Sequence, residues 1–417
     1  MKKMIRNLVC VSLFLLIIVN IVYSYPVDGY ATTGIRRLEI LRLRLEKKLS
    51  GTVPVSGGSK SISEIKLNLL KSPGADLEKL PAPDAELQKR LDALFPNRDE
   101  SYSLALLDIT PGRPMRFASR QIDREFSPGS VGKLAVAAGL FTELKAIYPN
   151  SIEARQKLLR ERMVTAGKWI RTDEHEVPIY EPKTGSYASR KIKENDVFSL
   201  YEWLDHMLSA SANAAASVVW KEAMLMRAFG KAYPPSRADE EAFFKNTSRT
   251  ELQKISLSVV NDPLRKAGIS QKDWQLGSFF TETGKAIVPG ARSYGNPGGL
   301  IWYIIRMEQG KLIDEWSSLE IKRLMYMTAK RIRYASSPAL TQAAVYFKSG
   351  SFYKHKPEEG FVPKKYTGNI YNYMNSVAVV EQPDGGVYLV ALMSNVLRKN
   401  SAVDHQTIAA QIDKILK

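Results

Sequence analysis

The sequence predicts a mixed α/β fold of the α+β type, in which one antiparallel sheet is built from both ends of a domain and an all-α lobe is inserted between them. Near the start of this domain, residues 102–110 and 115–119 alternate in hydropathy around a Pro-Gly turn, as expected for a β-hairpin. Near its end, residues 373–381 and 387–394 form a second strand pair. Helical patterns fill the middle of the chain, so we expect the two strand pairs to share one sheet with flanking helices.

The chain of 417 residues has the composition of a globular protein with a sizeable core. Hydrophobic residues make up 44% and charged residues 25%, which excludes collagen-like, low-complexity and multi-span membrane proteins. There are 60 Lys and Arg against 43 Asp and Glu, a formal net charge of +17. The single cysteine, Cys10, lies in the first segment, which excludes a disulfide scaffold, a cysteine nucleophile and a thiolate metal site from the mature protein.

Residues 1–24 have the pattern of a secretory signal peptide. Lys2, Lys3 and Arg6 precede an apolar run at residues 8–23, and small residues follow where cleavage is expected. We therefore expect an exported protein, periplasmic or secreted. The alternative is that the segment stays uncleaved and anchors the chain in a membrane, although the run is short for a membrane span.

Residues 25–83 are expected to form a basic helical and linker extension rather than a domain. The first helix, over residues 35–49, combines apolar residues at helical spacing with six Lys and Arg against two Glu, and a Gly/Ser-rich linker follows at residues 56–59. Such a helix is suited to contact an anionic membrane or a cell-wall polymer. The alternative is docking on its own domain with the cations facing water. The domain then spans residues 84–417, with the helical lobe at about 149–340.

Ser130 and Lys133 stand at the start of an apolar helix predicted over residues 130–147. Residues three apart lie on one side of a helix, where an amine whose pKa is lowered by burial can take the proton of the hydroxyl. The same Ser-x-x-Lys pattern also begins at Ser63 and at Ser351. The pattern alone therefore does not assign a nucleophile.

Two further motifs follow Ser-x-x-Lys in order along the chain. Residues 211–213 read Ser-Ala-Asn at the junction of two helices, and residues 348–350 read Lys-Ser-Gly after a strand-like segment. Together the three motifs resemble those of the penicillin-recognising serine hydrolases, the superfamily of class A β-lactamases and D-Ala-D-Ala peptidases. The resemblance covers about residues 84–417 and implies a β-lactamase/transpeptidase-like fold.

Two other segments imitate these motifs. Residues 183–185 read Lys-Thr-Gly, but they precede the Ser-x-Asn motif and follow a proline rather than a strand. Residues 294–296 read Tyr-Gly-Asn, like the Tyr-x-Asn motif of class C relatives. We prefer the motifs at residues 130–133, 211–213 and 348–350, because they fit both the expected order and the expected secondary structure.

The resemblance implies acyl transfer through Ser130. The hydroxyl attacks a carbonyl after Lys133 accepts its proton, and the backbone N–H groups of Ser130 and Ser351 hold the developing oxyanion. Ser211 relays the proton to the departing nitrogen. We therefore expect Ser130, Lys133 and Ser211 to be catalytic, with a β-lactam or a peptidoglycan-like D-Ala-D-Ala peptide as the acyl donor.

The same resemblance implies a set of substrate-binding residues. Asn213 binds an amide of the substrate, and Lys348 with Ser349 receives its carboxylate. Gly350 and Ser351 complete the set. The four histidines are scattered and no metal-ligand spacing occurs, so we expect neither a cofactor nor a metal. No nucleic-acid module is visible in the sequence, and we expect no nucleic-acid partner.

The sequence departs from the class A pattern where deacylation is decided. Those β-lactamases activate the deacylating water with the Glu of a Glu-x-x-Leu-Asn loop, and no such pattern occurs between Asn213 and Lys348. The nearest counterpart of that Glu is Glu282, which lies near the expected position and is the candidate deacylation base. We expect an acyl-enzyme that deacylates slowly. The alternatives are an efficient class A β-lactamase that uses Glu282, and a non-catalytic envelope-binding protein with the same fold.

Overall fold

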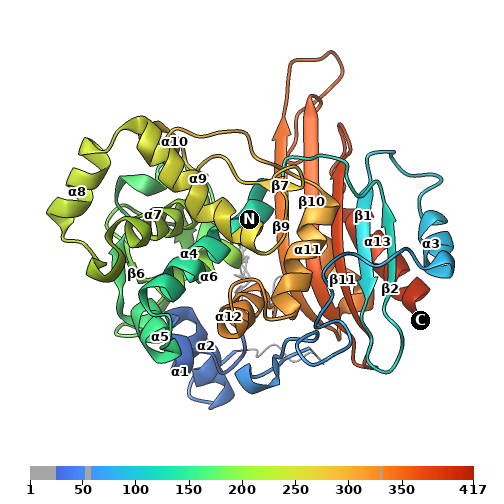
Figure 1. Ribbon diagram of the computed structural model, residues 1–417, viewed down its shortest axis with the longest axis horizontal. Helices are drawn as coiled ribbons and strands as arrows, with labels where there is room; N and C mark the ends of the chain where they lie inside the picture. Colours follow the sequence, from blue (N-terminus) through green and yellow to red (C-terminus); the bar gives the residue numbers. More distant parts are fainter. Residues whose placement is uncertain (1–24, 52–57, 329–330) are drawn as a thin grey trace, which may run out of the picture.

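Five antiparallel strands from both ends of the chain form one sheet, in the order β2-β1-β11-β10-β9 (Figure 1). The structure, a computed structural model, describes residues 25–51, 58–328 and 331–417. The strands pair in antiparallel register, for example Leu106 with Val390 across β1 and β11. The predicted sheet shared by both ends is confirmed. Its strands are β1 (Ser103–Asp108), β2 (Arg116–Arg120), β9 (Ala344–Lys354), β10 (Tyr371–Glu381) and β11 (Val387–Asn395).

Helices cover both faces of this sheet. Successive residues of a strand point to opposite faces, so Leu106 and Leu392 join one apolar cluster while Leu107 and Ala391 join the other. Ile408 of α13 packs in the first cluster, and α11 contacts β11, β1 and β10 on the second face. Burial on both faces explains why these strands are almost continuously apolar. The covering helices are α3 (Ala85–Asp92), α11 (Pro297–Glu308) and α13 (Ala402–Leu416).

The predicted helical lobe lies within the segment between β2 and β9, which also contains the sheet-covering helix α11 (Figure 1). Its helices are α4 (Lys133–Ile147), α5 (Ile152–Glu161), α6 (Leu200–Leu208), α7 (Asn213–Phe229), α8 (Arg237–Asn246), α9 (Arg249–Lys266), α10 (Glu282–Ile287) and α12 (Glu315–Met325). Three two-stranded sheets accompany these helices. The sequence did not predict them, because their strands are too short or too polar for a clear alternating pattern. They pair β3 (Met163–Thr165) with β6 (Val197–Ser199), β4 (Glu176–Glu181) with β5 (Ser186–Lys191), and β7 (Trp274–Gln275) with β8 (Tyr294–Gly295).

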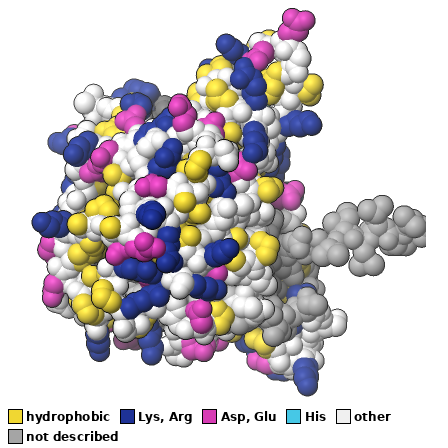
Figure 2. Space-filling model, turned by 90° about the vertical axis from the view of Figure 1, so that its right-hand side faces the viewer, with side chains coloured by type: hydrophobic (Ala, Val, Ile, Leu, Met, Phe, Trp, Pro, Cys, Tyr) yellow, Lys and Arg dark blue, Asp and Glu magenta, His cyan; other side chains and the backbone are white. Residues whose placement is uncertain are grey.

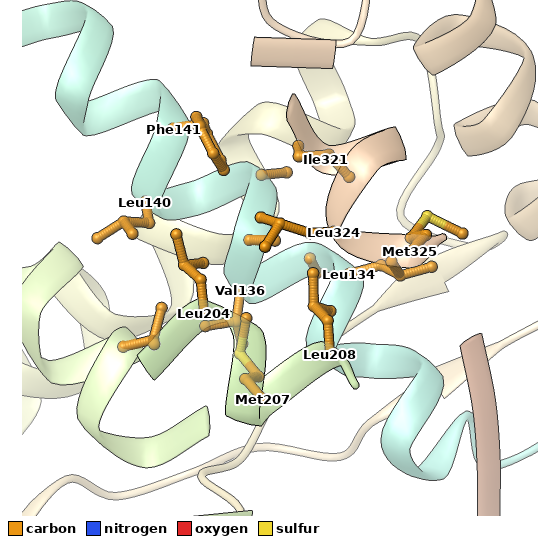
Figure 3. Packing of buried hydrophobic residues seen from close by; sticks show 14 of the residues in the cluster. Leu134, Val136, Leu140, Phe141, Leu204, Met207, Leu208, Ile321, Leu324 and Met325 are labelled. Carbon is orange, nitrogen blue, oxygen red and sulfur yellow. The ribbon is translucent and has the colours of Figure 1, made fainter. Parts of the chain in front are cut away.

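Helix α4 runs through the apolar core and is buried along most of its length. At Gly139 it approaches α9 so closely that an added Cβ would lie 2.8 Å from the backbone oxygen of Val259. A single turn of 3₁₀ helix, Gly129–Gly132, leads into it. Packing on all sides therefore fixes the start of α4. Figure 3 shows Leu134, Val136, Leu140 and Phe141 of α4 among Leu204, Met207 and Leu208 of α6 and Ile321, Leu324 and Met325 of α12.

The described part of residues 25–83 packs into the same core. Tyr25, Ile35 and Leu38 are buried in the cluster that contains α4. Its two α-helices are α1 (Tyr30–Thr33) and α2 (Arg36–Leu45), so the predicted helix ends four residues earlier than expected. The N-terminal extension is thus part of the folded body. The predicted signal peptide, residues 1–24, lies outside the described residues.

Two cations of α2 turn inward and bind α6. Arg37 donates to both carboxylate oxygens of Asp205 at 2.5 Å, and both side chains are buried. Arg36 donates to Glu202 at 2.7 Å. Helix α2 therefore docks on its own domain, which was one of the two expected alternatives. The expectation placed its cations in water, whereas Arg36 and Arg37 face α6. Charge pairs therefore fix the position of α6 from outside the lobe.

A buried network of charges makes a second attachment of the extension. Lys322 of α12 lies 2.8 Å from Glu308 and 2.9 Å from Glu381, and Lys60 and Asn68 of the extension bind these same carboxylates. Burial alone would raise the pKa of Glu381, but the ammonium groups of Lys322 and Lys60 lower it to about 2. The network therefore keeps this carboxylate charged between α12 and the sheet.

The surface is mixed in charge. Figure 2 shows Lys and Arg interspersed with Asp and Glu over one face of the molecule, while the loop between β9 and β10, residues 355–370, projects from the top. Val362, at 72% exposure, lies on this loop. Within the described ranges, no helix has the length and apolarity needed to cross a bilayer.

We predict that Arg37→Ala destabilises the protein by about 3–5 kcal/mol, because it leaves the Asp205 carboxylate buried without its cation. Urea unfolding of the protein measures the change. Arg42→Ala is the matched control, since Arg42 of the same helix pairs with Glu39 and Glu46 at the surface, and its loss should destabilise the protein far less. Equal losses for the two variants would contradict the prediction.

Candidate active site

The turn before α4 lies in direct contact with strand β9. Gly129 has a φ of +52°, and an added Cβ there would lie 2.8 Å from the backbone nitrogen of Ser351. An added Cβ at Gly350 would lie 2.3 Å from the carbonyl oxygen of Pro128 and 3.1 Å from the nitrogen of Ser130. Only glycines allow these two backbones to approach so closely. The contact brings the backbone of Ser130 beside Ser351.

Lys133 is buried at the centre of the site. Its Nζ donates to Ser130 Oγ at 3.0 Å, to Asn213 Oδ1 at 2.7 Å and to the carbonyl oxygen of Ser211. Burial lowers the pKa of Lys133 to about 7, although the Asp173 carboxylate opposes the shift. An amine with this pKa is partly neutral near pH 7, so it can accept the proton of the Ser130 hydroxyl.

Ser211 lies between two amines. Lys348 Nζ donates to Ser211 Oγ at 2.8 Å, and Lys133 Nζ is 3.5 Å from the same oxygen. Ser211 has a φ of +60°, an uncommon conformation for a residue with a side chain. Burial lowers the pKa of Lys348, and the cations Lys133 and Arg333 lower it further. The hydroxyl of Ser211 is thus connected to both lysines that the sequence assigned to the site.

Two residues that the sequence did not single out hold these parts in place. Arg333 donates to the carbonyl oxygen of Gly350 at 2.7 Å. Asn375 pairs with Gly350 across β9 and β10, and its Nδ2 donates to the carbonyl oxygens of Ser127 at 2.9 Å and Pro128 at 3.1 Å. Asn375 therefore ties the turn that carries Ser130 to the sheet. An Asn within the apolar run of β10 is the signal that could have identified it.

Ser130, Asn213 and Ser351 line a cavity of about 760 Å³. One wall is an aromatic row of Phe352, Tyr371, Tyr373 and Phe126, with successive ring centroids 5.1, 5.6 and 6.2 Å apart. Phe352 directly follows Ser351 and is 49% exposed. The cavity therefore continues from Ser351 along an apolar surface.

Glu282 is not brought to this cavity with the other predicted site residues. It is the first residue of α10, its side chain is 68% exposed, and it pairs with Lys285 at 2.6 Å. Lys285 lines the cavity, whereas Glu282 is not among the residues that line it. The structure thus groups Ser130, Lys133, Ser211, Asn213, Lys348, Ser349, Gly350 and Ser351, and leaves Glu282 at the surface of α10.

The two segments that imitate the motifs have other positions. Residues 183–185 form the exposed turn between β4 and β5. Asn296 caps α11, with its Oδ1 accepting the backbone N–H of Gly299 at 2.8 Å. Both segments therefore have local structural roles. In the part of the chain that the structure describes, no group of three or more His, Cys, Asp or Glu could hold a metal ion.

No family model matches the sequence, and no curated protein matches it significantly. Solved structures do match. A class A β-lactamase from Bacteroides cellulosilyticus is 16% identical over 81% of this chain and 98% of its own, with a TM-score of 0.50. A β-lactamase from Chitinophaga pinensis is 13% identical over 79% of this chain and 97% of its own, also with a TM-score of 0.50. The chain has the β-lactamase fold. The resemblance indicated by the three motifs is therefore confirmed at the level of the fold.

We predict that acylation of Ser130 by a fluorescent penicillin becomes faster as pH rises through about 7, because the neutral amine of Lys133 is the form that accepts the proton. Stopped-flow labelling from about pH 5 to about pH 9 measures the rate. Lys133→Arg should not be labelled at any pH, since a guanidinium stays protonated. A labelling rate that is independent of pH would contradict the assignment.

Proposed function

We propose that this protein is an exported serine hydrolase that forms an acyl-enzyme on Ser130 with β-lactams or D-Ala-D-Ala-like peptides, and that deacylates slowly. The observation that carries the proposal is the buried Lys133 amine, which has a pKa of about 7 and lies 3.0 Å from Ser130 Oγ. A lysine that served only to stabilise the fold would be paired with a carboxylate rather than with hydroxyl, amide and carbonyl oxygens.

Acylation follows from the contacts of Ser130. Lys133 takes the hydroxyl proton while Oγ bonds to the carbonyl carbon, and the N–H groups of Ser130 and Ser351 stabilise the oxyanion. The carbon–nitrogen bond then breaks. Ser211, hydrogen-bonded to Lys348 and close to Lys133, passes the proton to the departing nitrogen. The product is an ester on Ser130 and a free amine.

The order of groups along β9 gives the direction of the bound acyl donor. Lys348 and Ser349 would receive its carboxylate, and Ser351 would hold the carbonyl oxygen two residues further along the strand. The acyl portion beyond the carbonyl would then lie toward Phe352 and the aromatic row. The Nδ2 of Asn213 is the group to bind an amide of this portion, because its Oδ1 already accepts from Lys133.

Slow deacylation follows from the position of Glu282. General-base assistance is worth about 10²–10⁴-fold in rate, and it requires a base within reach of the attacking water. Glu282 pairs with Lys285 on the surface of α10 and does not line the cavity that contains Ser130. An ester on Ser130 would therefore persist without help from this carboxylate.

The test is covalent trapping. The mature chain incubated with a fluorescent penicillin should gain the mass of one penicillin, and peptide mapping should find it on Ser130. Ser130→Ala is the control and should stay unlabelled. A label on Ser63, which begins another Ser-x-x-Lys pattern in the extension, would contradict the assignment. A wild type that gains no mass would contradict the proposed function as a whole.

We predict that Glu282→Gln changes the rate at which the penicillin adduct decays by less than about twofold, because an exposed carboxylate outside the cavity gives no general-base assistance. The fraction of adduct remaining is followed by intact mass after excess penicillin is removed. Rapid turnover of a chromogenic cephalosporin that Glu282→Gln abolishes would instead identify an efficient β-lactamase that uses Glu282.

A further inference from the structure

His175 lies on the wall of the cavity that contains Ser130, and a buried carboxylate fixes its imidazole ring. Nδ1 of His175 is 2.6 Å from Oδ1 of Asp173, whose side chain is 4% exposed. The other oxygen of Asp173 accepts the backbone N–H of Ala214 at 2.7 Å, in the first turn of α7. With a carboxylate as its partner, Nδ1 carries the ring proton, and Nε2 is left as the basic nitrogen.

Asp173 is suited to hold this tautomer. Burial alone would raise the pKa of Asp173, but the hydrogen bond from His175 and that from the Ala214 N–H outweigh burial and lower it. The carboxylate therefore stays charged and does not take the imidazole proton. Asp173 acts as a positioning residue for the ring.

Other carboxylates on the cavity wall are tied to cations. Glu125 pairs with Arg292, and Glu174 pairs with Lys191. Within the described residues, no hydrogen bond is made to Nε2 of His175. Among the described residues of this wall, His175 thus has a ring nitrogen that can accept a proton from a water molecule.

The same turn connects His175 to the acylation machinery. Asn213, which accepts a hydrogen bond from Lys133, directly precedes Ala214, which binds Asp173. The Asp173 carboxylate is also close enough to Lys133 to influence its pKa. The ring is therefore held by the turn that carries the Ser-x-Asn motif.

We propose that His175 is the general base that deacylates Ser130, an inference that rests on the proposed function. Nε2 takes a proton from a water whose oxygen bonds to the ester carbonyl carbon, and the bond from this carbon to Ser130 Oγ breaks. Oγ regains a proton from the new carboxylic acid by way of Lys133, the product leaves as a carboxylate, and His175 releases its proton to solvent.

The experiment compares decay of the penicillin adduct in the full mature chain and in His175→Gln. Decay should slow by about tenfold or more, while acylation stays within about twofold of the wild type. His355→Gln is the matched control, because His355 belongs to the projecting loop and does not line the cavity, and its adduct should decay as in the wild type. Added imidazole should restore decay to His175→Ala in proportion to its concentration.

Three outcomes would overturn the inference. Equal decay in the wild type and in His175→Gln would exclude His175 as the base while leaving the acyl-enzyme on Ser130 established. A slow His175→Ala variant that imidazole does not rescue would assign His175 a structural role only. Failure of the wild type to form any adduct would remove the proposed function, and this inference with it.

Discussion

Desolvation of one amine, that of Lys133, is the constraint on which the rest of the site depends. In water this group would be almost fully protonated at neutral pH and useless as a base. Its pKa of about 7 exists because the start of α4 is enclosed by packed helices on one side and by β9 on the other. The groups around it are oxygens of Ser130, Ser211 and Asn213, which bind the amine without the full charge of a carboxylate. The packing of the core therefore sets the pKa of the amine at the centre of the site.

The N-terminal extension contributes to that enclosure from a distance. Helix α6 packs against α4 and leads directly to Ser211, and the charges of α2 bind α6 on its outer side. A segment outside the site thus holds the helix that leads to Ser211. Removal of Arg37 is costly because Asp205 would stay buried without its cation, whereas removal of one partner of a surface pair costs little.

The sequence predicted the fold, and it singled out the eight residues that the structure groups, because both leave local signals. Apolar strand pairs around turn residues and three short motifs in a fixed order can be read without knowing which segments meet. Asn375, Arg333 and the pair of Asp173 and His175 could not be found in this way, because their importance lies in contacts across the fold with Pro128, Gly350 and Ala214. The environment of the extension could not be predicted either. Its leucines have helical spacing, but nothing in the spacing tells whether they face a membrane or the core.

The attachment of the extension also determines when the protein can fold. Tyr25 donates to Glu320 at 2.6 Å, across 295 residues of sequence, and Lys60 binds Glu381, across 321. The first segments of the chain to be synthesised therefore have partners that are made last. Until residue 381 has emerged, the apolar residues Ile35 and Leu38 have no complete core to enter and remain exposed to other proteins. A nascent chain of this kind can complete its core only when synthesis is nearly finished, and until then its apolar segments are the ones that a chaperone would have to protect.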